Sequence, residues 1–151
     1  MKKMNYDDLY TDTDINTGED IFYIDSELKI PFNGVVVDFF KGVLSWEFDV
    51  RNGYRHGKER KFYDSGELME ENDVKNNTVD GVAKEFYKNG KMKSISIVIR
   101  NAFVDTIYYD EEGNYIGKDS INENDIGYFL IANKIDEYRN KYRLEGWYGE
   151  I

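Results

Sequence analysis

Two copies of one phrase decide the architecture of this chain: Gly57-Lys-Glu-Arg-Lys-Phe-Tyr-Asp-Ser-Gly-Glu-Leu68 and Gly81-Val-Ala-Lys-Glu-Phe-Tyr-Lys-Asn-Gly-Lys-Met92. Their first glycines, their phenylalanines and their second glycines are each 24 residues apart. Three landmarks at one spacing indicate an internal repeat. Each copy is an alternating run that ends in two aromatic residues, followed by a short turn with glycine and then an apolar residue. This unit predicts a β-hairpin.

The same phase continues on both sides of these copies. Gly42 lies 24 residues before Gly66, and Gly113 lies 23 residues after Gly90. We therefore predict a mainly β protein, a meandering antiparallel sheet of repeated β-hairpins over residues 21–116. Its first strand signal, Ile-Phe-Tyr-Ile at 21–24, is interpreted as a degenerate first copy of the unit.

The strand expected at 43–50 indicates which face of the sheet is buried. Leu44, Trp46, Phe48 and Val50 alternate with polar or small residues. Such alternation is typical of a strand with one face against the core. We expect Trp46 and Phe48 on the buried face.

A helical period replaces the alternation near the C-terminus. Apolar and tyrosine side chains recur there at helical spacing: Ile121, Tyr128, Ile131, Ile135, Tyr138 and Tyr142. Ser120-Ile-Asn-Glu123 matches a capping box. We predict an amphipathic α-helix over 120–142. It either covers the open face or end of the sheet or binds a partner.

Residues 1–20 form a polar N-terminal segment, whose centre carries oxygen ligands at alternate positions. A calcium loop of the EF-hand type needs glycine at its sixth position and a carboxylate at its twelfth. Counted from Asp12, those positions hold Thr17 and Tyr23. We therefore favour a solvated turn rich in Asx residues, and we expect no metal site.

Length and charge bound the remaining possibilities. The 151 residues fit a single domain, 1–151, and 30 acidic against 20 basic residues give a net charge of −10. An acidic surface repels phosphate and attracts basic partners, so we expect no nucleic acid and no membrane among the partners. The chain has no cysteine, no apolar run of membrane-spanning length and no signal-peptide core at its start. We expect a cytoplasmic protein.

Catalytic patterns are missing from the sequence. One histidine, no cysteine and no nucleophile elbow leave nothing from which to assemble a common triad or a zinc site. No glycine-rich nucleotide loop occurs either. We expect no catalytic residue, no cofactor and no enzymatic activity. A pair of carboxylates hidden among the acids remains an alternative.

The hairpin unit resembles the variant form of the MORN repeat, and Gly53-Tyr-Arg-His56-Gly57 is similar to the G-x-x-H-G element of ordinary MORN repeats. The resemblance covers about 21–116 and is strongest over 53–92. It implies a turn-forming role for His56. It also implies one of two functions: an antitoxin or immunity protein of bacteria, or a scaffold or lipid-binding array. The acidic charge disfavours lipid.

We therefore expect an immunity protein that binds a cognate toxin domain of basic charge and neutralises it by occlusion. The alternative is a non-catalytic MORN-like scaffold or protein-interaction module unrelated to toxins. The oligomeric state is left open. Tyrosines flanked by acids are the expected partner-binding residues, since tyrosine suits interface hot spots: Tyr63, Asp64, Tyr87, Tyr108, Tyr109, Asp110 and Glu111.

Overall fold

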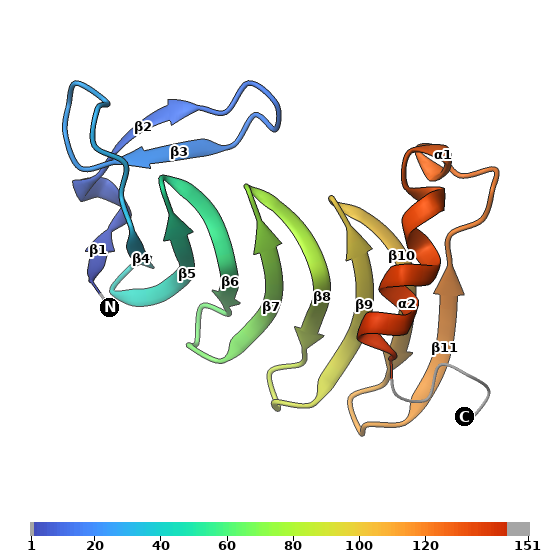
Figure 1. The fold of residues 1–151 in the computed structure, drawn as a ribbon. Coiled ribbons are helices and arrows are strands. Elements are labelled where there is room, and N and C mark those ends of the chain that lie inside the picture. Colours follow the sequence, from blue (N-terminus) through green and yellow to red (C-terminus); the bar gives the residue numbers. More distant parts are fainter. Residues whose placement is uncertain (1, 145–151) are drawn as a thin grey trace.

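A nine-stranded sheet dominates the computed structural model, which describes residues 2–144 (Figure 1). Eight of its strands follow one another as antiparallel neighbours, and this confirms the predicted meander of hairpins. They are β4 (Gly34–Phe40), β5 (Val43–Arg51), β6 (Tyr54–Phe62), β7 (Leu68–Lys75), β8 (Thr78–Phe86), β9 (Met92–Ile99), β10 (Ala102–Tyr109) and β11 (Tyr115–Ser120). The short β1 (Lys3–Asn5) pairs parallel to β4 at one edge.

A separate hairpin of β2 (Tyr10–Thr13) and β3 (Asp20–Tyr23) lies beside one end of the first strands (Figure 1). The 3₁₀ helix η1 (Tyr6–Asp8) joins β1 to it. The interpretation of residues 21–24 as a degenerate first copy is therefore wrong. Their strand pairs with β2 in a separate two-stranded sheet, and Phe22 of this segment packs in the cluster with Phe48 and Phe32.

Gly57 and Gly81 open the repeat because the strand before each copy approaches too closely for a side chain. A Cβ on Gly81 would lie 2.6 Å from Oδ2 of Asp73, and one on Gly57 would lie 2.6 Å from Oδ2 of Asp49. The same carboxylate oxygens accept the backbone N–H of the next residue, Val82 or Lys58, at 2.9 Å. Both glycines have φ near +127°, a region that other residues rarely adopt.

The opposite ends of the hairpins carry two-residue turns at the same 24-residue spacing: 52–53, 76–77 and 100–101. Every residue in these turns has positive φ, as a type I′ turn requires. The second residue of each of the last two turns donates its backbone N–H to the preceding hairpin, at Arg55 and Val79, and Gly53 of the first turn donates to Phe32, which lies just before β4. Adjacent hairpins are thereby tied together at their turns as well as along their strands.

Two hydrophobic clusters lie on opposite faces of the sheet. Near the N-terminus, Phe48 and Val36 are fully buried beneath Phe22 and Phe32. Phe48 was expected on the buried face and lies there, while Trp46 packs against this cluster and is only half buried. The second cluster forms near the C-terminus around alternate residues of β9 and residues of the C-terminal helices.

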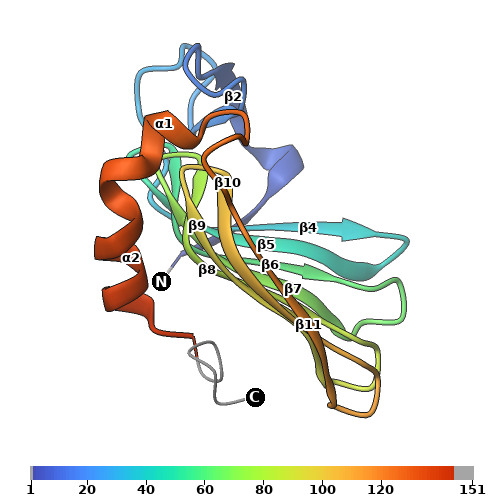
Figure 2. The same ribbon diagram turned by 90° about the vertical axis from the view of Figure 1, so that its right-hand side faces the viewer.

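Three short helical segments form the C-terminal element: α1 (Tyr128–Ile131), the 3₁₀ helix η2 (Ala132–Lys134) and α2 (Ile135–Tyr142). They lie along one side of the sheet (Figure 2). The predicted start at Ser120 is wrong, since Ser120 ends β11 and the first helix follows Gly127. The Ser120 hydroxyl donates to Oδ1 of Asp105 at 2.6 Å and so does not cap a helix.

Arg139 fastens α2 to the sheet. Its Nε and Nη2 donate to the two carboxylate oxygens of Asp105 at 2.7 and 2.8 Å, and the Asp105 side chain is fully buried. Tyr138 donates to Oδ1 of Asp80 at 2.5 Å, and burial together with this hydrogen bond raises the pKa of Tyr138. Of the two roles left open for the helix, the structure therefore has it covering a sheet face. Over residues 2–144 no helix combines the length and the apolar character that crossing a membrane demands.

Candidate functional site

The two faces of the sheet can be followed residue by residue across the strands, because successive residues of a strand point to opposite faces. Ile95, Ile97 and Ile99 of β9 pack against the C-terminal helices, so we call their side the helix face. Ser94 and Ser96 point the other way, toward what we call the groove face. Cross-strand partners share a face, so the register of the strands assigns the remaining strand residues to the helix face or to the groove face.

On the helix face, charged side chains form a row of alternating sign. Glu47 of β5, Arg60 of β6, Glu71 of β7 and Lys84 of β8 are direct cross-strand neighbours. Arg60 bonds to both acids, to Oε1 of Glu47 at 3.0 Å and to Oε2 of Glu71 at 3.3 Å. Asp73 is likewise paired with Lys58 of the neighbouring strand. The carboxylates of Glu47, Glu71 and Asp73 are therefore each paired with a cation of a neighbouring strand.

On the groove face, the corresponding row is not balanced. It runs through Lys61, Glu70, Glu85, Ser94 and Tyr108 on β6 to β10. Glu70 and Glu85 stand directly opposite each other, an arrangement that costs free energy for like charges. Among the described residues, no Lys or Arg forms an ion pair with either glutamate.

A second groove-face row, one pleat away, is buried and polar. It passes through Glu59, Asn72, Ala83, Ser96 and Thr106, each of which is less than a tenth exposed. The Ser96 and Thr106 hydroxyls bond to each other at 2.7 Å, and Asn72 donates to Oε1 of Glu59. These side chains are small or hydrogen-bonded to one another, so they form the buried base of the groove face.

Glu59 at the inner end of this base belongs to a buried ion pair with Arg55. Arg55 also donates from Nη2 to the backbone oxygen of Asn77 at 3.1 Å and lies 5.7 Å from the Trp46 ring centroid. A buried pair that is fully hydrogen-bonded holds the local structure in one arrangement. Glu59 is therefore structural, while the glutamates of the first row remain accessible.

Two hollows lie along the groove face. One, of about 130 Å³, is lined by Lys61, Glu70, Glu85, Ser94 and Ser96. Phe103, which is 56% exposed, borders both this hollow and the next. The two hollows therefore adjoin at the Phe103 ring.

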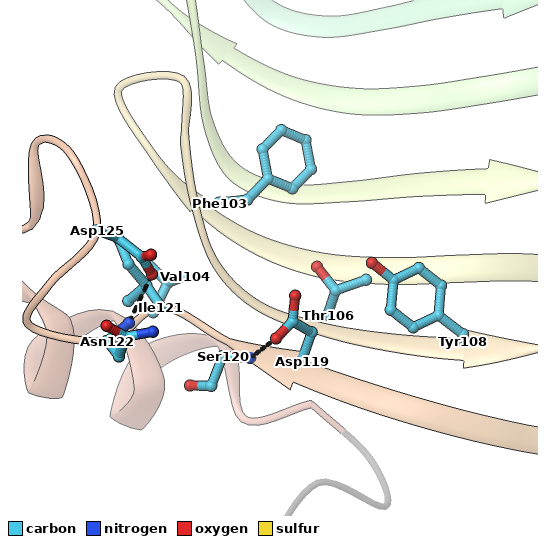
Figure 3. A pocket seen from close by; sticks show the side chains of 9 residues that line it. All are labelled: Phe103, Val104, Thr106, Tyr108, Asp119, Ser120, Ile121, Asn122 and Asp125. Atoms are coloured by element: carbon cyan, nitrogen blue, oxygen red, sulfur yellow. Dashed lines mark hydrogen bonds between the residues drawn. The ribbon is translucent and has the colours of Figure 1, made fainter.

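The second hollow, of about 270 Å³, lies over β10 and β11 (Figure 3). Figure 3 shows Phe103, Thr106 and Tyr108 projecting from β10 on the same side, with Asp119 beside Thr106. Asp119 and Asp125 accept only backbone N–H groups, from Ser120 and Asn122, and neither has a cationic partner in the described part of the chain. Aromatic rings and unpaired carboxylates thus line the groove face over β10 and β11.

Most of the residues predicted to bind a partner lie along one rim of the sheet, where the turns after β6, β8 and β10 succeed one another. Tyr63 donates its hydroxyl to the backbone oxygen of Phe86 at 2.6 Å, and Tyr87 donates to that of Tyr109 at 2.7 Å. These two tyrosines therefore tie each turn to the next. Asp64 is exposed on this rim.

Tyr109 ends β10, and Asp110 and Glu111 begin the turn that follows it. The Tyr109 side chain packs against the helix-face cluster. The carboxylate of Asp110 accepts the N–H groups of Asn114 and Glu112, and the Asn114 bond is the main reason that the pKa of Asp110 is lowered. Glu111 is exposed. The contact role of these rim residues stays a prediction.

Tyr108 is the one residue of the predicted set that lies on the groove face, where it is 41% exposed. Sequence reasoning missed the other residues of this face that line the hollows, Phe103, Glu70, Glu85 and Ser94. The alternation of serine with isoleucine in Ser94-Ile-Ser-Ile97 was a usable signal, because it puts small hydroxyl residues on the face opposite the apolar one.

His56 and Asp14 have structural roles. His56 lies within β6 and not in a turn of its own, and its Nδ1 accepts the N–H of Asn76, a residue of the 76–77 turn, at 3.4 Å. Burial is the main cause of its lowered pKa. The Asp14 carboxylate accepts from Asn16, Thr17 and Asn77. Within residues 2–144 no group of three or more His, Asp or Glu side chains is placed to hold a metal ion.

The comparisons with known proteins concern the repeat. Residues 55–76 and 79–97 match the family model described as MORN repeat variant. No curated protein matches the chain. A solved structure, the Glycosylation Associate Protein (Gap123) complex from Streptococcus agalactiae, is similar at 16% identity and a TM-score of 0.41. The match covers 82% of this chain and 27% of that one. The hairpins from β6 to β9 therefore carry the pattern of the MORN repeat variant.

Proposed function

We propose that this protein is a non-catalytic interaction module whose groove face binds a basic surface of a protein partner. The observation that carries this proposal is the difference in charge pairing between the two faces. Helix-face carboxylates such as Glu47 and Glu71 form ion pairs with Arg60, whereas no ion pair within residues 2–144 involves the groove-side acids Glu70, Glu85, Asp119 and Asp125. A partner with a basic surface would supply the cations that pair with these carboxylates.

The partner proposed is a cognate toxin domain of basic charge, which the protein neutralises by occlusion in the cytoplasm. The resemblance of the hairpin unit to MORN-type immunity proteins supports this partner, and the charge supplies a mechanism. A net charge of −10 steers a basic domain into fast association, which suits an inhibitor that must bind before damage is done. Exposed Phe103 and Tyr108 add aromatic anchors beside the carboxylates.

A scaffold unrelated to toxins is the second candidate, and one observation favours it. Ile126, Phe129 and Leu130 around α1 are 103%, 78% and 62% exposed. Three large apolar side chains in one short segment form a surface of the kind that binds another protein. A scaffold would use this surface and the groove face for two partners.

Co-expression tests the proposal. The protein is produced together with the candidate toxin domain encoded by the adjacent upstream gene, and growth and co-purification at physiological salt are measured. Protection of the cells with a stable complex is the expected result. Unprotected cells and no complex would overturn the toxin proposal and leave the scaffold in its place.

Charge reversal then locates the contact surface. Glu85→Lys on the groove face should slow association, while Glu111→Lys tests the rim predicted from the sequence. Both side chains are exposed and make no hydrogen bond or ion pair within the described residues, so neither change should unfold the protein. If Glu111→Lys alone weakens the complex, the rim is the contact surface and the groove face is not.

A further inference from the structure

The groove-face row contains three oxygen-bearing side chains on three consecutive strands. Glu70 on β7, Glu85 on β8 and Ser94 on β9 are successive cross-strand partners. Side chains in such positions have Cβ atoms about 5 Å apart. All three line the hollow of about 130 Å³, which is large enough for one side chain.

The two glutamates repel each other, and the chain does not relieve that repulsion. Lys61 is the next residue in the row beyond Glu70, but its ammonium nitrogen lies 5.8 Å from the ring centroid of Trp46 and makes no ion pair in the described structure. Lys61 therefore leaves the space between Glu70 and Glu85 without a cation.

Ser94 supplies an independent observation at the same place. Its side chain faces the hollow although the residue is only 5% exposed, and its hydroxyl has no hydrogen-bond partner within residues 2–144. Ser96, two residues on, bonds with Thr106 instead. The Ser94 hydroxyl therefore reaches the hollow with its hydrogen-bonding capacity unused by the described chain, and a donor of a ligand in the hollow can bond to it.

Two carboxylates and one hydroxyl match the donors of a primary ammonium. A lysine ammonium has three N–H donors that can point to three separate acceptors, whereas arginine presents a planar fork suited to one carboxylate. We propose that Glu70, Glu85 and Ser94 form a subsite for one lysine side chain of a protein partner. This inference rests on the proposed function, because it names the chemical group that the groove face recognises.

Tyr108 extends the subsite along the same row. It is the cross-strand partner of Ser94 and is 41% exposed. Its ring can cover the methylene stem of the lysine, as apolar stems pack on aromatic surface while the charged end reaches a polar group. Figure 3 shows this ring projecting from β10 on the side of Thr106 and Phe103.

Nuclear magnetic resonance on the full chain tests the subsite. A blocked pentapeptide with one central lysine between glycines is titrated into the ¹⁵N-labelled protein, with the norleucine peptide as control. Amide shifts should concentrate at Glu70, Glu85, Ser94 and Tyr108 for the lysine peptide alone. Glu85→Gln should weaken binding about fivefold and Ser94→Ala about twofold.

Glu112→Gln is the matched control, since it removes one exposed carboxylate outside the row. Shifts spread over the whole acidic surface, equal binding of the norleucine peptide, or equal weakening by Glu112→Gln and Glu85→Gln would each overturn the subsite. Localised lysine binding without protection against the toxin would keep the subsite and overturn the toxin partner. Protection without localised lysine binding would overturn the subsite alone.

Discussion

The helix-face row Glu47, Arg60, Glu71 and Lys84 alternates in sign over β5 to β8, whereas the groove-face row on β6, β7 and β8 reads Lys61, Glu70 and Glu85. Both rows cross the same hairpins, so the difference does not arise from the repeat. It arises from which position of each strand carries the charge. The acids of the alternating row are paired with cations of the same row, whereas Glu70 and Glu85 of the unbalanced row are available to pair with a cationic partner.

The largest expected effect concerns the buried part of the groove face. Phe48→Ala removes a fully buried ring from the N-terminal cluster and should lower the free energy of unfolding by about 4 kcal/mol. Trp46→Ala should cost about half as much, because this side chain is only half buried and its indole N–H has no partner in the described structure. Urea unfolding monitored by circular dichroism measures both.

Phe40→Ala is the control for this comparison, since Phe40 is 55% exposed and its removal should change stability by less than about 0.5 kcal/mol. A loss for Phe48→Ala no larger than that of the control would mean that the N-terminal cluster is not the core of this face.

A middle-sized effect concerns the contact that makes the helix face a covered face. Arg139→Ala leaves the buried Asp105 carboxylate without its cation and should cost about 3 kcal/mol. Hydrogen exchange should then show faster opening of α2 than of β6. Adding Asp105→Asn should recover much of the loss, because no buried charge remains. A loss under 1 kcal/mol for Arg139→Ala would show that apolar packing alone holds the helix.

The smallest effect tests the comparison of the two rows directly. Glu71→Gln removes the acid bonded to Arg60 and should destabilise the protein by about 0.5 kcal/mol. Glu85→Gln removes one of two opposed like charges and should be neutral or stabilising by about 0.3 kcal/mol. Paired urea titrations at low salt measure this difference, which should shrink at 1 M salt. Equal losses for both variants would mean that the rows do not differ in charge balance.

The repeat could be predicted from the sequence because its signals, the glycine positions and the alternation of side chains, are local. The 24-residue spacing of the glycines reflects a backbone requirement, since Gly57 and Gly81 combine positive φ with a carboxylate at the position of a Cβ. The alternation that placed Phe48 on the buried face is equally local. The sheet of hairpins therefore follows from patterns that a short window of sequence contains.

The boundary between the sheet and the C-terminal helices was predicted wrongly because the same short sequence is compatible with a helix cap and with the end of a strand. Ser120-Ile-Asn-Glu123 has the composition of a capping box, yet Ser120 continues the pairing of β11 with β10 and bonds to Asp105. Whether a serine caps a helix or ends a strand depends on what lies beside it. The segment 21–24 was misinterpreted for a related reason, since its Phe22 packs in a core formed by residues distant in the sequence, such as Phe48 and Phe32.

The sequence by itself determined the hairpin meander, its phase and the excess of acid, because glycine turns, alternation and composition are local or additive properties. Only the tertiary structure decided which acids are paired. Lys61, Glu70 and Glu85 stand in one row, and Arg60 reaches both Glu47 and Glu71, because bulges shift the register between strands. A cross-strand neighbour depends on the register of two separate segments, and no single segment contains that information.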